Sequence, residues 1–342
     1  MSLKNLSAKI RIPKILENKL NNKKISIIYN RFAKSLNVKD PFIVAVSGGA
    51  DSLALAFLSK IYSIKQQVAS KFFVVDHKLR KGSTKEAKIV KQVLKKFLIN
   101  VEILTWKGKK PKSNIQSLAR KKRYDLLYNV CKKNKIDNIF LGHHRDDLFE
   151  NFFIRILRGS GLNGLISLNK KNKINNINLY RPLINEKKEN LEFLSKYVFN
   201  YYAKDPSNKN EKFLRIKVRN LIKDLQDNGL DKKKFKKTIN NLRYANDAIS
   251  FYVTKNLQKN VSFLSKRNKL ILNKDFFLQP KEVTFRSLSE SIKLIGKKHY
   301  PVRGKKLDKV IDEIKNNTVL KLTLGGCIIQ KLSQTVIISK EH

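Results

Sequence analysis

Short apolar runs alternate with helical apolar spacing over the first half of the chain. The first run, Phe42–Val46, is apolar and largely β-branched, as a strand buried on both faces would be. Apolar side chains then recur at helical spacing from Leu53 to Ile61, and Asp51 and Ser52 stand where helix-capping residues are expected. The pattern predicts a strand, a tight turn and a helix.

The same alternation continues to residue 157. Further strands are predicted at 71–76, 101–106 and 138–142, and further helices at 84–98, 115–133 and 146–157. Alternating elements of these lengths favour the α/β class, with a doubly wound parallel sheet covered on both faces. Such sheets bind ligands outside the carboxyl ends of their strands. The residues that directly follow the strands are therefore the candidates for chemistry.

The second half of the chain changes character. Residues 170–178 are rich in Asn and Lys with little to bury, which predicts a loop or a mobile segment. Residues 207–243 carry 12 Lys and Arg against 4 acidic residues, with helical apolar spacing through 214–225. Short apolar runs at 319–324, 327–329 and 336–338 predict strands. We therefore expect a basic helical domain and then a small C-terminal α+β module.

These changes divide the 342 residues into four predicted parts. They are an N-terminal lead segment at 1–24, an α/β domain at 25–206, the basic helical domain at 207–290 and the C-terminal domain at 291–342. The lead segment lacks the apolar core of a signal peptide, and no apolar run is long enough to span a membrane. With only two cysteines, far apart, a reduced cytoplasmic protein is expected.

The charge indicates a polyanionic partner. The chain carries 74 Lys and Arg against 27 Asp and Glu, a net charge of +47. Such a surface raises the local concentration and on-rate of nucleic acid. Richness in Lys, Asn and Ile together is also typical of compositional drift in an AT-rich genome, so part of the excess lysine has this second explanation.

Residues 47–52, Ser-Gly-Gly-Ala-Asp-Ser, form the first candidate site. The two glycines allow a sharp turn and a close approach of backbone to ligand. The N–H groups and dipole of the following helix favour phosphate. The commonest phosphate loop has Lys after its last glycine, and none follows Gly49. A different nucleotide loop is therefore predicted, the alternative being a chance Gly-Gly turn before a helix.

Polar side chains also follow two later strands. Asp76 and His77 follow one of them, and residues 142–151 follow another with two histidines, two aspartates and a glutamate. Asp147 and Glu150 are three apart and would share a helix face. Carboxylates beside a triphosphate suit Mg²⁺ or a cationic substrate. A solvated helix start is the alternative, and the two histidines lack a third ligand at zinc-site spacing.

Arginines form further candidates. Arg120 and Arg123 lie one turn apart within 119–124, where they would pair with phosphate or carboxylates or form a solvated basic face. Arg158 ends a helix just before a glycine-rich loop, a position that suits the helix dipole with or without RNA.

In this order the motifs resemble the ATP pyrophosphatases and, among them, the bacterial tRNA(Ile)-lysidine synthetases. The matching stretches are Ser-Gly-Gly-Ala-Asp-Ser (47–52), Val-Asp-His-Lys-Leu-Arg (75–80), Ala-Arg-Lys-Lys-Arg-Tyr (119–124), Gly-His-His-Arg-Asp-Asp-Leu-Phe-Glu (142–150), Arg-Gly-Ser-Gly-Leu-Asn-Gly-Leu (158–165), Arg-Pro-Leu (181–183), Asp-Pro-Ser-Asn (205–208) and Leu-Gly-Gly-Cys (324–327). The first motif is common to many pyrophosphatases. The Asp-Asp-x-x-Glu segment followed by Arg-Gly-Ser-Gly-Leu is far more specific.

The chain departs from the family pattern at a few positions. Lys78 replaces a glycine, Leu148, Phe149 and Asn151 replace Gln, a small residue and Thr, and Ile216 and Lys217 interrupt an Arg-Asn-Arg run. The carboxylates are all present.

The resemblance implies an adenine nucleotide alpha hydrolase-like fold and a ligase that forms a carbon–nitrogen bond. ATP, with Mg²⁺, would adenylate the C2 oxygen of the wobble cytidine in the isoleucine tRNA with a CAU anticodon. Free L-lysine would then attack C2 and expel AMP.

The resemblance also assigns site residues. The catalytic residues would be Asp51, Arg120, Asp147 and Glu150. ATP would bind at Ser47, Gly48, Gly49, Ala50, Asp51, Ser52, Asp76, His77 and His143. Lysine would bind at Asp51, Asp147 and Glu150, and Mg²⁺ at Asp51 and Asp147. The tRNA would contact Arg80, Arg158, Arg181, Asn208, Arg215 and Arg219.

Alternatives belong to other classes. Another tRNA-modifying pyrophosphatase such as a thiolase would call for a cysteine pair, which this chain lacks. An amidotransferase-type synthetase for a small molecule would not need the basic domain. A non-catalytic RNA-binding protein would tolerate loss of the carboxylates. A homodimer is compatible with the sequence, and no membrane partner is expected.

Overall fold

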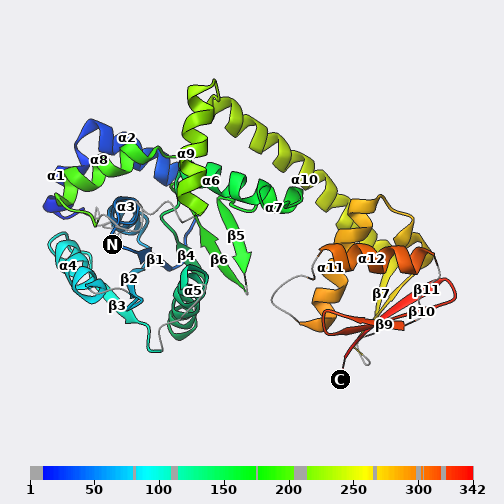
Figure 1. Cartoon of the computed structure of the whole chain (residues 1–342). Coiled ribbons are helices and arrows are strands. Elements are labelled where there is room, and N and C mark those ends of the chain that lie inside the picture. Colours follow the sequence, from blue (N-terminus) through cyan, green and yellow to red (C-terminus); the bar gives the residue numbers. More distant parts are fainter. Residues whose placement is uncertain are drawn as a thin grey trace, which may run out of the picture. The chain divides into compact units, whose positions relative to one another are not determined.

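The computed structural model describes residues 11–79, 82–108, 115–174, 176–203, 214–264, 268–297, 302, 304–316 and 321–341 (Figure 1). The chain forms two compact units, Met1–Leu230 and Asp231–His342. The boundaries expected from the sequence, at 206/207 and 290/291, do not coincide with this division. None of the helices in the described ranges is long and apolar enough to cross a membrane.

A six-stranded sheet organises the first unit, in the order β3-β2-β1-β4-β6-β5. The strands are β1 Phe42–Val46, β2 Ser70–Asp76, β3 Val101–Thr105, β4 Asn138–Phe140, β5 Lys171–Ile174 and β6 Ile177–Tyr180. All neighbours pair parallel except β5, which is antiparallel to β6. The strand order reverses between β1 and β4, so a ligand crevice is expected beyond their carboxyl ends.

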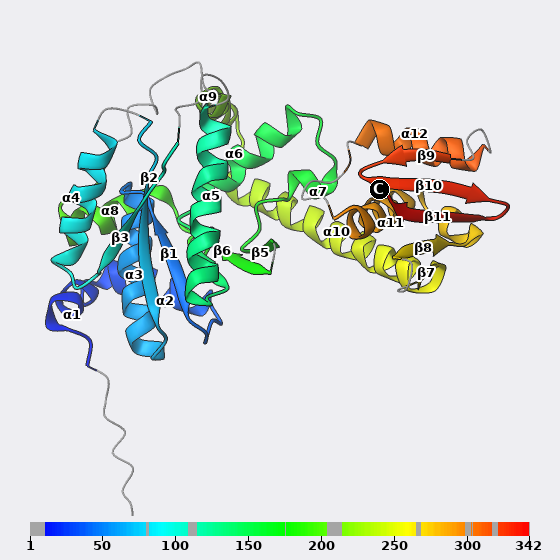
Figure 2. The same ribbon diagram turned by 90° about the horizontal axis from the view of Figure 1, so that it is seen from below.

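Helices cover both faces of this sheet (Figure 2). The helices of the first unit are α1 Lys14–Leu20, α2 Lys23–Lys34, α3 Ala50–Gln66, α4 Ser83–Lys95, α5 Ile115–Asn134, α6 Arg145–Ile156, α7 Leu162–Leu165, α8 Lys188–Phe199 and α9 Leu214–Asp227. Successive residues of β1 face opposite layers, as the pleat of a strand requires. Phe42 and Val44 pack in the core with α3, and Ile43 packs with Leu127 and Cys131 of α5. The predicted doubly wound α/β sheet is confirmed.

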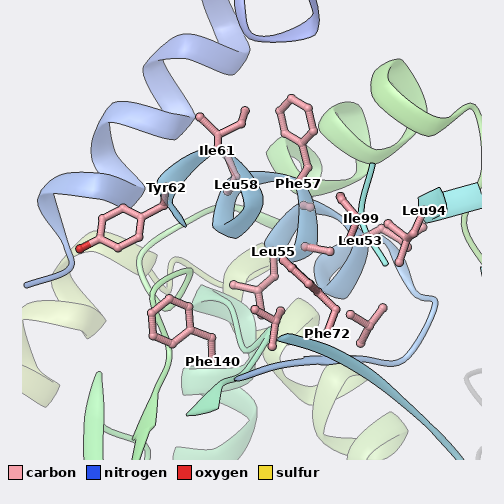
Figure 3. Packing of buried hydrophobic residues seen from close by; sticks show 14 of the residues in the cluster. Leu53, Leu55, Phe57, Leu58, Ile61, Tyr62, Phe72, Leu94, Ile99 and Phe140 are labelled. Atoms are coloured by element: carbon pink, nitrogen blue, oxygen red, sulfur yellow. The ribbon is translucent and has the colours of Figure 1, made fainter. Parts of the chain in front are cut away.

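Aromatic and aliphatic side chains hold β1 and β4 beneath α3 (Figure 3). The rings of Phe42 and Phe140 stack with centroids 4.2 Å apart, which ties the two strands that flank the crevice. Leu53 and Leu55 of α3 are fully buried in the same core. Burial of side chains of this size stabilises the fold by roughly 1.5–3 kcal/mol each. The two strands whose ends carry the candidate site are therefore anchored in a packed core.

Residues 170–178 correct the sequence-based expectation of a loop. Residues 171–174 form β5 and pair antiparallel with β6, which begins at Ile177, and Asn176 just before β6 has a φ of 65°. Ile177 and Leu179 are buried, and β6 adds in parallel to β4. Strand β5 lies at the sheet edge, where backbone pairing alone suffices, so its polar side chains gave no strand signal.

The second unit combines helices with an antiparallel sheet in the order β7-β8-β11-β10-β9. Its elements are α10 Lys232–Asn260, β7 Val261–Leu264, β8 Lys269–Leu272, the 3-10 helix η3 Lys274–Phe277, α11 Lys281–Gly296, α12 Gly304–Lys315, β9 Lys321–Leu324, β10 Cys327–Leu332 and β11 Thr335–Lys340. Strands β7 and β8 lie within the stretch that the sequence analysis expected to be helical.

Pairing with strands that are distant in sequence explains why β8 was not predicted. Leu270 and Leu272 are buried because β8 pairs with β11, more than 60 residues later. In isolation, four-residue runs of this kind carry little period-2 signal. Residues 319 and 320, which were expected to begin a strand, lie outside the described residues. In the first unit, α1 falls inside the predicted lead segment and buries Leu16 and Leu20.

Candidate active site

The loop at 47–52 connects β1 to α3 and is held by its own last side chain. The hydroxyl of Ser52 accepts hydrogen bonds from the N–H groups of Ser47 and Gly48, at 3.0 and 3.1 Å. It donates to the carbonyl of Gly49 at 2.9 Å. The helix begins after Gly49, without a side-chain cap. The expectation that Asp51 and Ser52 cap α3 was therefore wrong, because Ser52 closes the loop instead.

Two glycines, Gly48 and Gly142, leave little room for a side chain around this loop. Gly48 has a φ of +89°, and a Cβ there would lie 2.7 Å from Cγ2 of Val90 on α4. Gly142, just after β4, faces the loop from the other side. A Cβ on Gly142 would lie 3.3 Å from both Cα and N of Ser52. The segment after β4 thus approaches the nucleotide loop by direct backbone contact.

Two aspartates meet at His144 in the space between these segments. His144 is the N-cap of α6 and is 3% exposed. Its Nε2 lies 3.6 Å from Oδ2 of Asp51 and 3.6 Å from Oδ2 of Asp147. Asp147 also accepts the N–H of His144 at 2.9 Å. The structure therefore brings together the loop carboxylate and the α6 carboxylate that the sequence analysis had assigned to one site.

The surroundings of the two aspartates shift their pKa values in opposite directions. Burial raises the pKa of Asp51, and Asp147 adds to this, while His144 and Lys188 oppose it. Oδ1 of Asp51 is buried and has no hydrogen-bond partner among the described residues. For Asp147, burial is outweighed by His144, His143 and the His144 N–H, so its pKa is lowered. Asp147 therefore stays anionic beside a less acidic Asp51.

Glu150, one turn further along α6, has a partner that the sequence did not reveal. Its carboxylate is 3% exposed and pairs with Arg219 of α9, with Nε 2.6 Å from Oε1 and Nη2 3.4 Å from Oε2. Arg219 was expected to contact tRNA, and Glu150 to bind lysine. Helix α9 packs on α6 within the first unit. The residue expected to contact tRNA is therefore an ion-pair partner of the residue expected to bind lysine.

Asp76 has a local role that differs from the predicted contact with ATP. It is 2% exposed and accepts from the hydroxyls of Ser83 and Thr84, at 2.8 and 2.6 Å, and from the Lys78 N–H at 3.0 Å. Burial would raise the pKa of Asp76, but these three hydrogen bonds and the Lys78 charge lower it. The carboxylate therefore joins the end of β2 to the start of α4.

Replacing this carboxylate should make stability depend less on pH. Asp76→Asn is expected to lower the free energy of unfolding by about 1–2 kcal/mol at about pH 7, because weaker neutral hydrogen bonds replace charge-assisted ones. A carboxylate whose pKa is lower in the folded state stabilises the protein at pH values above its unfolded-state pKa of about 3.9. This stabilisation is lost as the pH falls through the folded-state pKa. Denaturant titrations should therefore show the gap closing below about pH 4. A gap that stays constant across the range would contradict this role for Asp76.

The surroundings lower the pKa of both His77 and His143. Burial and the Arg123 guanidinium, which donates from Nε to Nε2 of His77 at 3.3 Å, lower the pKa of His77 to about 4. Burial also lowers the pKa of His143 well below its usual range. Nδ1 of each ring is buried without a hydrogen-bond partner among the described residues. Both rings therefore retain an unsatisfied polar atom for a ligand, which fits their predicted place at the nucleotide.

The predicted arginines differ in exposure. Arg120, Arg158 and Arg215 are exposed, and Arg120 lies over the Tyr124 ring at 5.3 Å. Arg181 is only 5% exposed, and it donates from Nη1 to the Asn169 carbonyl at 2.7 Å. It thus supports the backbone that leads into the β5–β6 hairpin, a position that does not favour direct contact with RNA. The predicted tRNA contacts Arg80 and Asn208 lie outside the described residues.

Sequence reasoning missed His144 as a site residue and named its neighbour, His143, instead. The pattern of apolar and polar residues does not show which of the two adjacent histidines after β4 faces the site. The available signal was position, because His144 directly precedes Arg-Asp-Asp at a helix start, where an N-cap is expected. The geometry places its ring, rather than that of His143, between the two aspartates.

Among the described residues, no group of three or more His, Cys, Asp or Glu side chains is arranged to hold a metal ion. Magnesium is commonly held by one or two carboxylates together with waters and substrate phosphates. Asp51 and Asp147 provide that smaller donor set, and the unpartnered Oδ1 of Asp51 fits it.

The sheet order, the glycine loop after β1 and the carboxylates after β4 define a class of ATP-using α/β domains. Residues 19–225 match the PP-loop domain family. A solved U34-tRNA thiolase of Methanococcus maripaludis has a similar fold, with a TM-score of 0.54 and 18% identity, covering 65% of this chain and 78% of that one. The class is therefore that of the PP-loop proteins, which use ATP.

Curated relatives narrow the class further. The tRNA(Ile)-lysidine synthase of Wolbachia sp. subsp. Brugia malayi is 32% identical over 302 residues, covering 87% of this chain and 70% of that protein. The tRNA(Ile)-lysidine synthase of Orientia tsutsugamushi is 36% identical over 306 residues, covering 87% and 69%. The chain belongs to the tRNA(Ile)-lysidine synthase family, as its motifs predicted.

Proposed function

We propose that this chain attaches lysine to C2 of the wobble cytidine in the isoleucine tRNA with a CAU anticodon, in two steps at one crevice. The observation that carries the proposal is the meeting of Asp51 and Asp147 at Nε2 of His144. The nucleotide loop supplies the first aspartate and α6 the second. This arrangement supports a site for ATP beside a site for a cation, which suits a ligase that joins an amine at the expense of ATP.

In the first step the cytidine C2 oxygen attacks the α-phosphorus of ATP, and the bond to pyrophosphate breaks. A base carbonyl oxygen is a poor leaving group, and adenylation converts it into part of AMP, a good one. The loop at 47–52 and the start of α3 stabilise the negative charge of the departing pyrophosphate. Bound Mg²⁺ would neutralise further charge on the phosphates, held by Asp51 and Asp147.

In the second step the ε-amine of lysine attacks C2, the C–O bond breaks and AMP leaves. Free lysine has a side-chain pKa of about 10.4, so it arrives as an ammonium ion and must lose a proton before it attacks. Asp147, whose pKa is lowered, binds the cation in its charged form. The carboxylates around the crevice then accept the proton. Glu150, which pairs with Arg219 at 2.6 Å, adds a third carboxylate on the same helix as Asp147.

Each of the two units has a helix with basic side chains that suit binding to tRNA. Arg215 and Lys217 on α9 are exposed, and Lys232, Lys233 and Lys234 begin α10. Such side chains bind phosphates without reading sequence, and the target cytidine must leave its stack to reach the crevice. A thiolase is less well supported, because Cys131 and Cys327, the two cysteines of the chain, are buried and lie in different units.

Labelled lysine tests the proposal directly. With ATP, Mg²⁺ and the CAU-anticodon tRNA, we expect label to enter the tRNA in equal amounts with the pyrophosphate and AMP released. The matched control is the same tRNA with guanosine at the wobble position, which lacks the reacting C2 oxygen and should take up no label. Intact tRNA binding without incorporation of lysine would refute the proposal.

A further inference from the structure

His144 has a different partner at each ring nitrogen. Nδ1 accepts the N–H of Asp146 at 3.2 Å, which caps the first turn of α6. A neutral imidazole has one acceptor nitrogen and one donor nitrogen. Because this hydrogen bond makes Nδ1 the acceptor, the network assigns the ring proton to Nε2. The ring is buried, so the cap fixes the direction of its Nε2–H.

This fixed N–H lies between two carboxylates that come from different elements. Asp51 is in the first turn of α3, and Asp147 is in the first turn of α6. Each presents Oδ2 at 3.6 Å from Nε2 of His144. Two adjacent anions repel each other strongly where water is largely excluded, and a shared donor offsets that repulsion. The same donor turns one oxygen of each carboxylate toward the ring.

The remaining oxygen of Asp51 is then left for a ligand. Oδ1 of Asp51 is buried and has no hydrogen-bond partner among the described residues. A buried acceptor without a partner costs free energy in the unliganded protein, and a bound cation would recover it. The capping hydrogen bond of His144 therefore determines, through Nε2, where this acceptor points.

We propose that His144 is a positioning residue, which fixes Asp51 and Asp147 through its Nε2–H as one cation-binding pair for the incoming lysine. The inference rests on the proposed function and extends it, because it assigns a role to a side chain that lies 3.6 Å from both carboxylates and that the sequence analysis gave no part in the reaction. Its two nitrogens have separable tasks. Nδ1 supports the helix start, and Nε2 orients the carboxylates.

Two substitutions separate these tasks. His144→Asn keeps a short acceptor at the N-cap, where Asn is among the best residues, but removes the donor at Nε2. His144→Gln places an amide N–H near the position of Nε2 but gives up the cap. We expect H144N to melt within a few degrees of the wild type and to raise the KM for lysine about ten- to a hundredfold, because the Nε2–H that lies 3.6 Å from both carboxylates is lost and neighbouring groups couple by this much. The kcat at saturating lysine should fall by a smaller factor.

H144Q should melt at a lower temperature than H144N yet have a KM for lysine nearer to that of the wild type. Unchanged KM in H144N would overturn the inference. A KM for lysine in H144Q as high as that in H144N would also overturn it. A loss in both variants that is confined to kcat and proportional to the loss of folded protein would do the same, because it would mark a merely structural role for His144. Wild-type protein that forms no lysidine would instead refute the proposed function, so the two failures are distinguishable.

Discussion

Asp51→Asn is expected to slow pyrophosphate release roughly a hundredfold or more while leaving tRNA binding nearly unchanged. The amide has the size of the carboxylate but no charge, and it removes one of the two oxygen ligands assigned to Mg²⁺. It also places an N–H₂ group where the buried, unpartnered Oδ1 lies or beside Nε2 of His144. The tRNA affinity should hold because the exposed basic helices are unaffected.

Pyrophosphate release in a single turnover and tRNA affinity are the two measurements. Asp40→Asn is the matched control, because Asp40 is an exposed aspartate of the same unit, just before β1. It should behave as the wild type in both assays. If Asp51→Asn releases pyrophosphate at the wild-type rate, Asp51 has no part in adenylation.

Glu150→Gln is expected to affect the second step instead. Lysine incorporation should fall roughly a hundredfold, because the α6 cluster loses a charge that attracts the ammonium ion, while pyrophosphate release is largely kept. Gln still accepts a hydrogen bond from Arg219, so the cost in folding stability should be only about 1–2 kcal/mol, although the side chain is 3% exposed.

The two steps are measured separately, because the prediction is that only the second one is slowed. Pyrophosphate release measured without lysine reports adenylation, and the partition of the adenylated tRNA with increasing lysine reports capture. Glu102→Gln on β3 is the matched control, since Glu102 is exposed and lies away from α6. Equal losses in both steps for Glu150→Gln would contradict an assignment to lysine capture.

The sequence predicted the crevice because its signals are local. An apolar β-branched strand, two glycines and a helix start are contiguous in 42–52, and the strand-end rule then placed residues 142–150 beside them. The fold class followed from the same alternation. These predictions needed no knowledge of side-chain partners, and the structure confirms the parallel sheet on which they rest.

Features that depend on distant partners were not predictable in this way. Glu150 and Arg219 are 69 positions apart, and no pattern in the chain links them. Strand β5 and strand β8 owe their existence to neighbours in their sheets, because their own sequences are too short or too polar to predict a strand. His144 was missed for a related reason, since its role depends on Asp51, which is distant in sequence.

The contact between Gly142 and Ser52 has a consequence for how this crevice withstands change elsewhere. A Cβ at position 142 would lie 3.3 Å from both Cα and N of Ser52, tighter than an ordinary van der Waals contact. A side chain at this position would therefore push the segment after β4 away from the loop that carries Asp51. Replacement of a lysine on the exterior of the chain exerts no such pressure, so the surface can change in composition while the spacing at Gly142 is kept.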